Sequence, residues 1–96
     1  MWPAWPAGVE PHRAVTVTLK LFASLGVHLP PGAREHAVQV EIPQGTSIGE
    51  LLDRFGVPPE QRHLVLRNGV FVSPAGRAEP LHAGDSVAVW PPVAGG

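Results

Sequence analysis

The chain has 96 residues, of which 44% are hydrophobic, and its formal net charge is −1. This length fits one domain with a modest core. The near balance of acidic and basic residues argues against a nucleic-acid partner and against a polybasic membrane anchor. Because the chain has no cysteine, a disulfide framework, a thiolate metal site and a cysteine nucleophile are excluded.

Residues 1–14 are expected to form an irregular N-terminal extension, because their prolines and tryptophans follow no periodic pattern. Trp2 and Trp5 give this extension two interpretations, a docking arm or a disordered terminus. Val9 is an alternative initiation site. The segment lacks the basic and apolar regions of a signal peptide, and no apolar run is long enough to span a membrane. We therefore expect a cytoplasmic location and no membrane partner.

Several segments have the pattern of β-strands. Residues 15–21 and 37–42 alternate apolar and polar side chains, which is typical of strands with one buried face. Residues 63–67 and 70–72 flank Asn68-Gly69, a strong hairpin signal. A turn-rich connection then leads to a last strand at residues 86–90, whose apolar Val87 and Val89 suit a central position in the sheet.

One helix is expected after the second strand. Ser47 and Glu50 have the spacing of a capping box. An apolar helical stripe follows at positions i, i+3, i+4 and i+7, formed by Ile48, Leu51, Leu52 and Phe55. Gly56 and the prolines after it end the helix.

The order of these elements is strand, strand, helix, strand, short strand, strand. This order predicts an α+β domain over residues 15–90, in which a mixed sheet of four to five strands packs on one main helix. The arrangement is that of the ubiquitin-like β-grasp. Residues 91–96 are expected to be a flexible tail that ends on Gly95-Gly96.

The diglycine carries the strongest functional signal. Glycine lets a backbone pass closely through a narrow channel, so a free terminal carboxylate on Gly96 can be threaded into another protein's active site. Pro91 and Pro92 stiffen the exit from the sheet and lower the entropy lost on insertion.

Several segments, in this order and spacing, resemble the small ubiquitin-like sulfur carriers, namely the small subunit of molybdopterin synthase and the thiamine-biosynthesis sulfur carrier. The matching segments are Leu21-Phe22-Ala23, residues 42–52 (Ile-Pro-x-Gly-Thr-x-Ile-x-x-Leu-Leu), Val65 to Gly69, residues 80–85 (Pro-Leu-x-x-Gly-Asp) and the ending Pro91-Pro92-Val93-Ala94-Gly95-Gly96. The ending is most similar to the molybdopterin-synthase branch.

The resemblance implies a non-catalytic carrier that binds no cofactor stably. An activating enzyme would use ATP to adenylate the carboxylate of Gly96, and a sulfur donor would convert it to a thiocarboxylate. The tail would then deliver sulfur to the large subunit of molybdopterin synthase, in molybdenum- or tungsten-cofactor biosynthesis. Thiamine synthesis and tRNA thiolation remain open as alternatives.

The resemblance also implies a partner-binding surface. Strand parity independently places Phe22 and Trp90 on the sheet face away from the helix, whereas the parity of Phe71 is ambiguous because the turn before it can carry a bulge. The partner-binding residues expected on this basis are Phe22, Phe71, Trp90, Pro91, Pro92, Val93 and Ala94.

Other polar residues give weaker indications of function. The five histidines have no helical i, i+4 spacing, so a metal site is not expected. Helix capping explains Glu50 and Asp53 better than acid–base catalysis does. Arg67 is expected to be a solvated charge at a strand end, or else a contact to an acidic partner group.

Two other classes of function stay open. In one, the same tail forms an isopeptide bond to lysines of target proteins, as in a ubiquitin-like modifier. In the other, the chain is a stand-alone interaction module whose diglycine has no chemical role.

Overall fold

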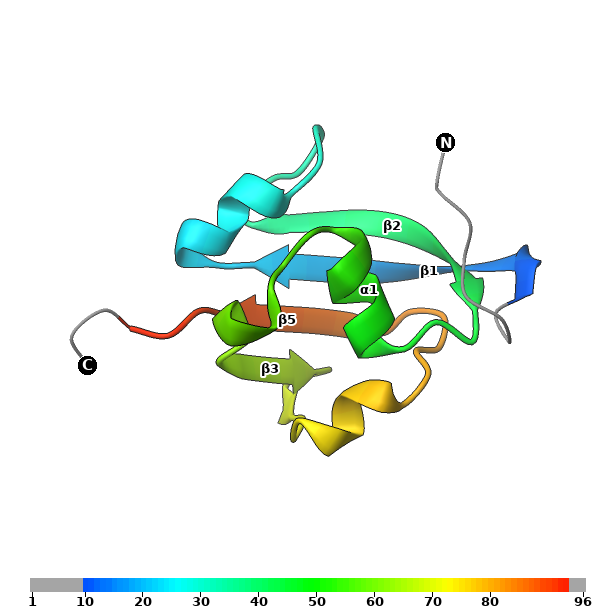
Figure 1. The fold of residues 1–96 in the computed structure, drawn as a ribbon. Coiled ribbons are helices and arrows are strands. Elements are labelled where there is room, and N and C mark those ends of the chain that lie inside the picture. The colour runs from blue at the N-terminus through cyan, green and yellow to red at the C-terminus, as the bar shows by residue number, and fades with distance from the viewer. Residues whose placement is uncertain (1–9, 94–96) are drawn as a thin grey trace.

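The computed structural model describes residues 10–93, with side chains described from residue 13. The strands are β1 (Glu10–Leu21), β2 (Ala37–Gln44), β3 (Leu64–Arg67), β4 (Val70–Phe71) and β5 (Ser86–Trp90). The α-helix is α1 (Ile48–Arg54), and three short 3-10 helices are η1 (Ala23–His28), η2 (Pro59–Gln61) and η3 (Ala75–Ala78). Figure 1 shows α1 lying across one face of the sheet. None of the helices within residues 10–93 has the length and apolar character needed to cross a membrane.

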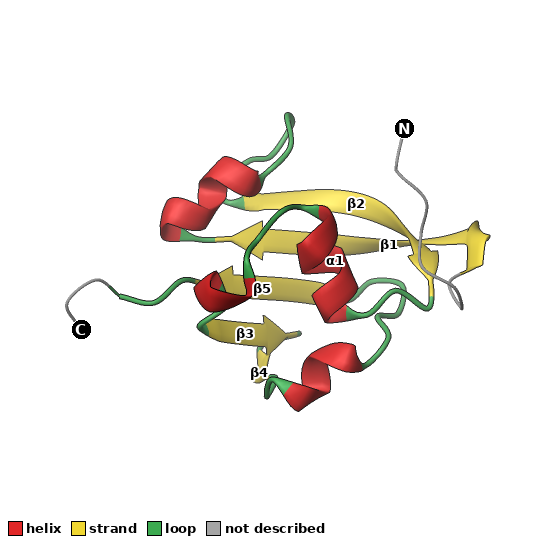
Figure 2. Cartoon of the chain, viewed as in Figure 1, coloured by secondary structure: helices red, strands yellow, loops and turns green. Residues whose placement is uncertain are grey.

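The five strands form one mixed sheet in the order β2-β1-β5-β3-β4. β1 and β5 are parallel neighbours, whereas β1 with β2, β3 with β5 and β3 with β4 are antiparallel. The strands and α1 are distinguished by colour in Figure 2. This topology confirms the expected α+β, ubiquitin-like β-grasp architecture, and it confirms the central position of the last strand.

The core lies between the sheet and α1. Leu19, Val65 and Val89 point from three neighbouring strands toward the helix and are fully buried. Leu51 and Leu52 of α1 meet them and are also fully buried. A continuous apolar layer of this kind supplies most of the stability of a small domain, at about 25 cal/mol for each Å² removed from water.

The start of α1 has the capping box that its sequence predicts. The Glu50 backbone N–H donates to Ser47 Oγ at 3.1 Å, and the Ser47 backbone N–H donates to Glu50 Oε1 at 2.9 Å. Gly56 follows the helix with a φ of +79°, as expected for a stop residue. The local signals of this helix were therefore sufficient to define both of its ends.

Ser47→Ala is expected to lower the free energy of unfolding by about 1 kcal/mol, because it removes the acceptor for the part-buried Glu50 backbone N–H at the start of the helix. Urea unfolding followed by circular dichroism measures this loss. Ser73→Ala is a matched control, since Ser73 Oγ accepts a longer bond of 3.2 Å from Gly76 in an exposed 3-10 turn. A Ser47→Ala midpoint that is no lower than that of the control would contradict the importance of the capping box.

The N-terminal boundary differs from the expected one. β1 begins at Glu10 rather than at Val15, so the end of the predicted 1–14 extension belongs to a strand. Glu10 pairs with Gln44, and the register shifts between Glu10 and Ala14. The strand alternation is lost across this irregularity, which is why the sequence pattern indicated a later start. The partner strand β2 also continues beyond its expected end, through Pro43 to Gln44. Trp2 and Trp5 lie outside the described residues.

Candidate functional site

The C-terminal segment leaves the domain from the middle of the sheet. β5 lies between β1 and β3, and its last residue, Trp90, is paired with Leu64. Pro91 is buried, whereas Pro92 and Val93 are exposed, and the segment emerges at the end of the sheet opposite to the start of β1 (Figure 1). Ala94, Gly95 and Gly96, which carry the expected chemistry, lie outside the described residues.

Two of the predicted partner-binding residues form a ring stack beside this exit. The Phe22 and Trp90 rings are 4.4 Å apart between centroids and only 4° from parallel. The Phe22 backbone N–H donates to the Val89 carbonyl at 3.1 Å, which fixes the end of β1 against β5. Since Leu21 and Val89 are buried against α1, their neighbours Phe22 and Trp90 occupy the opposite face.

The strand register resolves the parity of Phe71. Phe71 lies opposite Leu66, and Leu66 lies opposite Ala88. Directly opposed residues share a face of the sheet, so Phe71 is on the same face as Trp90. Its side chain is 60% exposed, which is unusual for a phenylalanine in a strand. We call this surface the apolar face; it is formed by Phe22, Leu64, Leu66, Phe71, Ala88 and Trp90.

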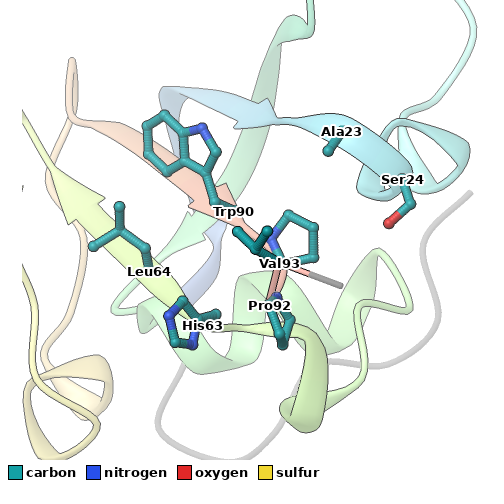
Figure 3. Close-up of a pocket in the computed structure, with 8 residues that line it drawn as sticks. Ala23, Ser24, His63, Leu64, Trp90, Pro92 and Val93 are labelled. Atoms are coloured by element: carbon teal, nitrogen blue, oxygen red, sulfur yellow. The ribbon is translucent and has the colours of Figure 1, made fainter. Parts of the chain in front are cut away.

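A pocket of about 480 Å³ opens where the apolar face meets the tail. Figure 3 shows Pro92 and Val93 between the start of η1 and the start of β3. The lining of the pocket is almost entirely apolar and comprises Ala23, Ser24, His63, Leu64, Trp90, Pro91, Pro92 and Val93. The structure thus brings three of the predicted tail residues and Trp90 into one site, together with four residues that the sequence did not indicate.

Backbone strain concentrates at the same end of the sheet. Among residues 10–93, four non-glycine residues have positive φ: Ala23 (53°), Glu35 (51°), His36 (69°) and Asn68 (52°). Asn68 occupies the Asn-Gly turn that favours this conformation. The other three flank Phe22, since Ala23 follows it directly and His36 stacks on it. Each such residue costs about 1 kcal/mol or more, and costs of this kind often mark functional sites.

His36 was not among the predicted site residues. Its ring lies 5.3 Å from the Phe22 ring with an interplanar angle of 29°, so His36, Phe22 and Trp90 form a continuous row of three rings. The His36 carbonyl accepts the Leu21 N–H at 2.9 Å, which anchors the turn beside Phe22. His36 and Phe22 are far apart in the sequence, so no local sequence pattern predicts that their rings are in contact.

Arg67 is neither a solvated charge nor free for a partner, which corrects both interpretations made from the sequence. It donates to Asp85 Oδ2 through Nε at 3.0 Å and through Nη2 at 2.6 Å, and Nη2 also lies 3.1 Å from His82 Nδ1. Asp85 accepts further bonds from Asn68 Nδ2 at 2.9 Å and from the His82 backbone N–H at 2.8 Å. This polar hub ties the turn after β3 to the loop before β5.

Electrostatics within the hub stabilise the charged form of Asp85. Burial by itself would raise the pKa of Asp85. The hydrogen bonds from Asn68, from the His82 backbone and from Arg67, together with the Arg67 charge, outweigh this effect and lower the pKa below its ordinary value. Asp85 is therefore an anion that organises the fold, with no sign of the raised pKa that a general acid needs.

The remaining candidates have structural partners. Glu50 belongs to the capping box of α1, and Asp53 pairs with Arg62 at 2.6 Å. Within the described part of the chain, no three histidine or acidic side chains gather closely enough to hold a metal ion.

Comparisons with known proteins agree with the β-grasp fold described above. The profile of the ThiS family matches residues 27–96. The chain belongs to the ThiS family. No curated protein sequence matches it significantly.

Three solved structures share the fold. Small archaeal modifier protein SAMP1 from Haloferax volcanii is 29% identical, with a TM-score of 0.58, over 84% of this chain and 99% of that chain. The Haloferax volcanii HVO 2177 protein is 25% identical, with a TM-score of 0.68, over 86% and 88% of the two chains. A Pyrococcus furiosus protein described as molybdopterin converting factor, subunit 1, is 25% identical, with a TM-score of 0.57, over 82% and 99%. The ThiS-family chain is thus a ubiquitin-like protein of the sulfur carrier and modifier group.

Proposed function

We propose that this protein is a sulfur carrier whose reacting group is the Gly96 carboxylate. The observation that carries the proposal is the position of the tail in a ThiS-family fold. The segment leaves a central strand at Trp90, and Pro91 holds it against the domain. Six residues from Pro91 to Gly96 reach about 20 Å when extended, which suits a carboxylate delivered into a deep active site.

The chemistry needs two partner enzymes and no catalytic group of this chain. A carboxylate is a poor acyl donor, so an adenylating enzyme first transfers AMP from ATP to a Gly96 carboxylate oxygen and releases pyrophosphate. A hydrosulfide equivalent then displaces AMP and leaves a thiocarboxylate. The acceptor enzyme takes the sulfur, and water restores the carboxylate. The chain itself holds no cofactor in this scheme, and ATP belongs to the activating enzyme.

The acceptor that we propose is the large subunit of molybdopterin synthase. The support is the Trp90-Pro91-Pro92-Val93 ending together with the structural similarity to the protein described as molybdopterin converting factor, subunit 1. Thiamine synthesis and tRNA thiolation use the same carrier chemistry and are the alternatives. Reconstitution with each purified acceptor and a thiocarboxylated carrier distinguishes them, because only the true acceptor returns the carrier to its carboxylate form.

Intact-mass measurement tests the carrier step. After incubation with the adenylating enzyme of the same organism, ATP and sulfide, the protein is expected to gain the mass difference between sulfur and oxygen. The gain should require ATP and should disappear in a variant that lacks Gly96. A wild-type mass that does not change under these conditions would overturn the proposal.

A second function is favoured by the similarity to small archaeal modifier protein SAMP1. In that function the activated Gly96 carboxyl group forms an isopeptide bond to a lysine of a target protein. The last lysine or arginine of the sequence is Arg77, so trypsin would leave residues 78–96 on the modified lysine rather than a diglycine. Detection of this branched peptide in cells expressing the protein would support the modifier function.

A further inference from the structure

The turn between η1 and β2 has an unusual composition for its conformation. Arg34 and Ala37 form an isolated antiparallel bridge with reciprocal bonds of 2.8 and 2.9 Å, so Glu35 and His36 are the two central residues of a tight turn. Both have positive φ, at 51° and 69°. Turns of this geometry strongly prefer Asn-Gly, so glutamate and histidine are energetically unfavourable residues at these two positions.

The strained turn has one clear geometric result, which is the position of the His36 ring. The ring lies over Phe22, 5.3 Å away, and extends the Phe22–Trp90 stack toward β2. His36 nevertheless remains exposed, so the ring does not complete the buried core. A solvent-exposed imidazole beside two aromatic rings offers both a flat contact surface and N–H donors.

The charged residues around the His36 ring indicate which groups of a partner protein this surface can bind. Lys20 lies on the same face, between Ala37 of β2 and Ala88 of β5 in the strand register, and it precedes Phe22 by two residues in the alternation of side chains. Arg34, at the first position of the turn, is exposed. The apolar face is thus bordered on its β2 side by two cations and an imidazole. The acidic groups on this side are Glu35 within the turn and Glu41, which lies farther along β2 opposite Thr16.

We propose that His36 is a specificity-determining residue of the partner-binding surface, held by a strained turn so that it extends the apolar face. The partner surface that fits it is a protein surface with an apolar centre and a carboxylate at the edge that meets His36 and Lys20. This inference rests on the proposed function, because the partner in question is the adenylating enzyme that receives the tail.

Stability and affinity should change in opposite directions when the turn is made ideal. In the double variant Glu35→Asn/His36→Gly, the turn acquires its preferred sequence and the ring is lost. The urea midpoint is expected to rise, while the affinity for the purified adenylating enzyme of the same organism, measured by calorimetry, is expected to fall about 10-fold. His36→Asn should lower affinity similarly, and His36→Phe should restore only part of it, because the ring returns without the N–H donors that meet the carboxylate.

A purely structural role for His36 makes the reverse prediction. If the ring only shields Phe22, its removal will lower the urea midpoint and leave the affinity unchanged, and that result would overturn the inference. Lys20→Ala provides a second measurement, because loss of the cation should weaken binding and reduce its dependence on salt. Failure of the wild-type protein to gain sulfur would instead count against the proposed function, so the two failures are distinguishable.

Discussion

Trp90→Ala is expected to weaken binding to the adenylating enzyme about 70-fold, because covering roughly 100 Å² of ring surface contributes about 2.5 kcal/mol. Trp90 lies at the point where the apolar face, the pocket and the tail meet. A partner that receives the tail must therefore approach this ring. Titration calorimetry with the purified enzyme measures the loss.

The same substitution also removes an intramolecular contact, so its effect on folding must be separated from its effect on binding. Loss of the stack with Phe22 is expected to lower the free energy of unfolding by about 1 kcal/mol. A folded domain would survive this loss, and circular dichroism would show an unchanged spectrum. Trp90→Phe should recover most of the affinity, because a ring can still stack on Phe22.

Neighbouring residues on β4 provide a cleaner comparison. Phe71 and Val70 are 60% and 67% exposed, but the register places them on opposite faces of the sheet. Phe71→Ala is therefore expected to reduce affinity, whereas Val70→Ala is expected to leave it unchanged. Equal effects of the two substitutions, or an unaltered affinity of Trp90→Ala, would show that the apolar face is not the docking surface.

The sequence predicted those parts of the fold whose signals are local. The Ser47 and Glu50 spacing, the apolar stripe of α1 and the apolar residues of β5 are each local features of the sequence, and the structure confirms the capping box, the helix and the strand that they predict. The central position of β5 also followed from its own apolar residues. Strand ends were less accurate, because the pairing of Glu10 with Gln44 depends on two distant segments.

The parts of the site that escaped prediction depend on long-range contacts. Arg67 and Asp85 are 18 residues apart, and no local pattern indicates that they pair. The face of Phe71 required the register of β3 against β5. His36 was overlooked for a further reason, since the Glu35-His36 turn lacks the glycine or asparagine by which such turns are found. His36, which breaks this local rule, thus belongs to the row of rings that includes Trp90.

Asp85→Ala is expected to lower the free energy of unfolding at neutral pH by about 3 kcal/mol, because it leaves a largely buried guanidinium without its anion. The Arg67 and Asp85 side chains are only 21% and 12% exposed, so water can replace the lost carboxylate only in part. For a small domain whose total stability is about 5–10 kcal/mol, this is a large fraction. Urea unfolding at pH 7 gives the value.

The pH dependence of this effect follows from the lowered pKa of Asp85. A carboxyl group whose pKa is lower in the folded state than its unfolded value near ~3.9 stabilises the fold fully above that unfolded value. The stabilisation is lost as the pH falls through the lower, folded-state pKa. Wild type and Asp85→Ala should therefore differ most at neutral pH and converge in acid.

Asp53→Ala is the matched control for this measurement, since it also removes an aspartate that pairs with an arginine at 2.6 Å. The Asp53 side chain is 68% exposed, and Arg62, although only 8% exposed, still donates through Nε to the Val57 carbonyl at 3.0 Å when Asp53 is absent. The loss of this pair is therefore expected to cost only about 0.5 kcal/mol. If the two substitutions had equal effects, the polar hub around Asp85 would not hold the turn after β3 against the loop before β5. A larger loss at Asp85 would show that this hub stabilises the contact between the turn after β3 and the loop before β5, at the start of the strand that ends on Trp90.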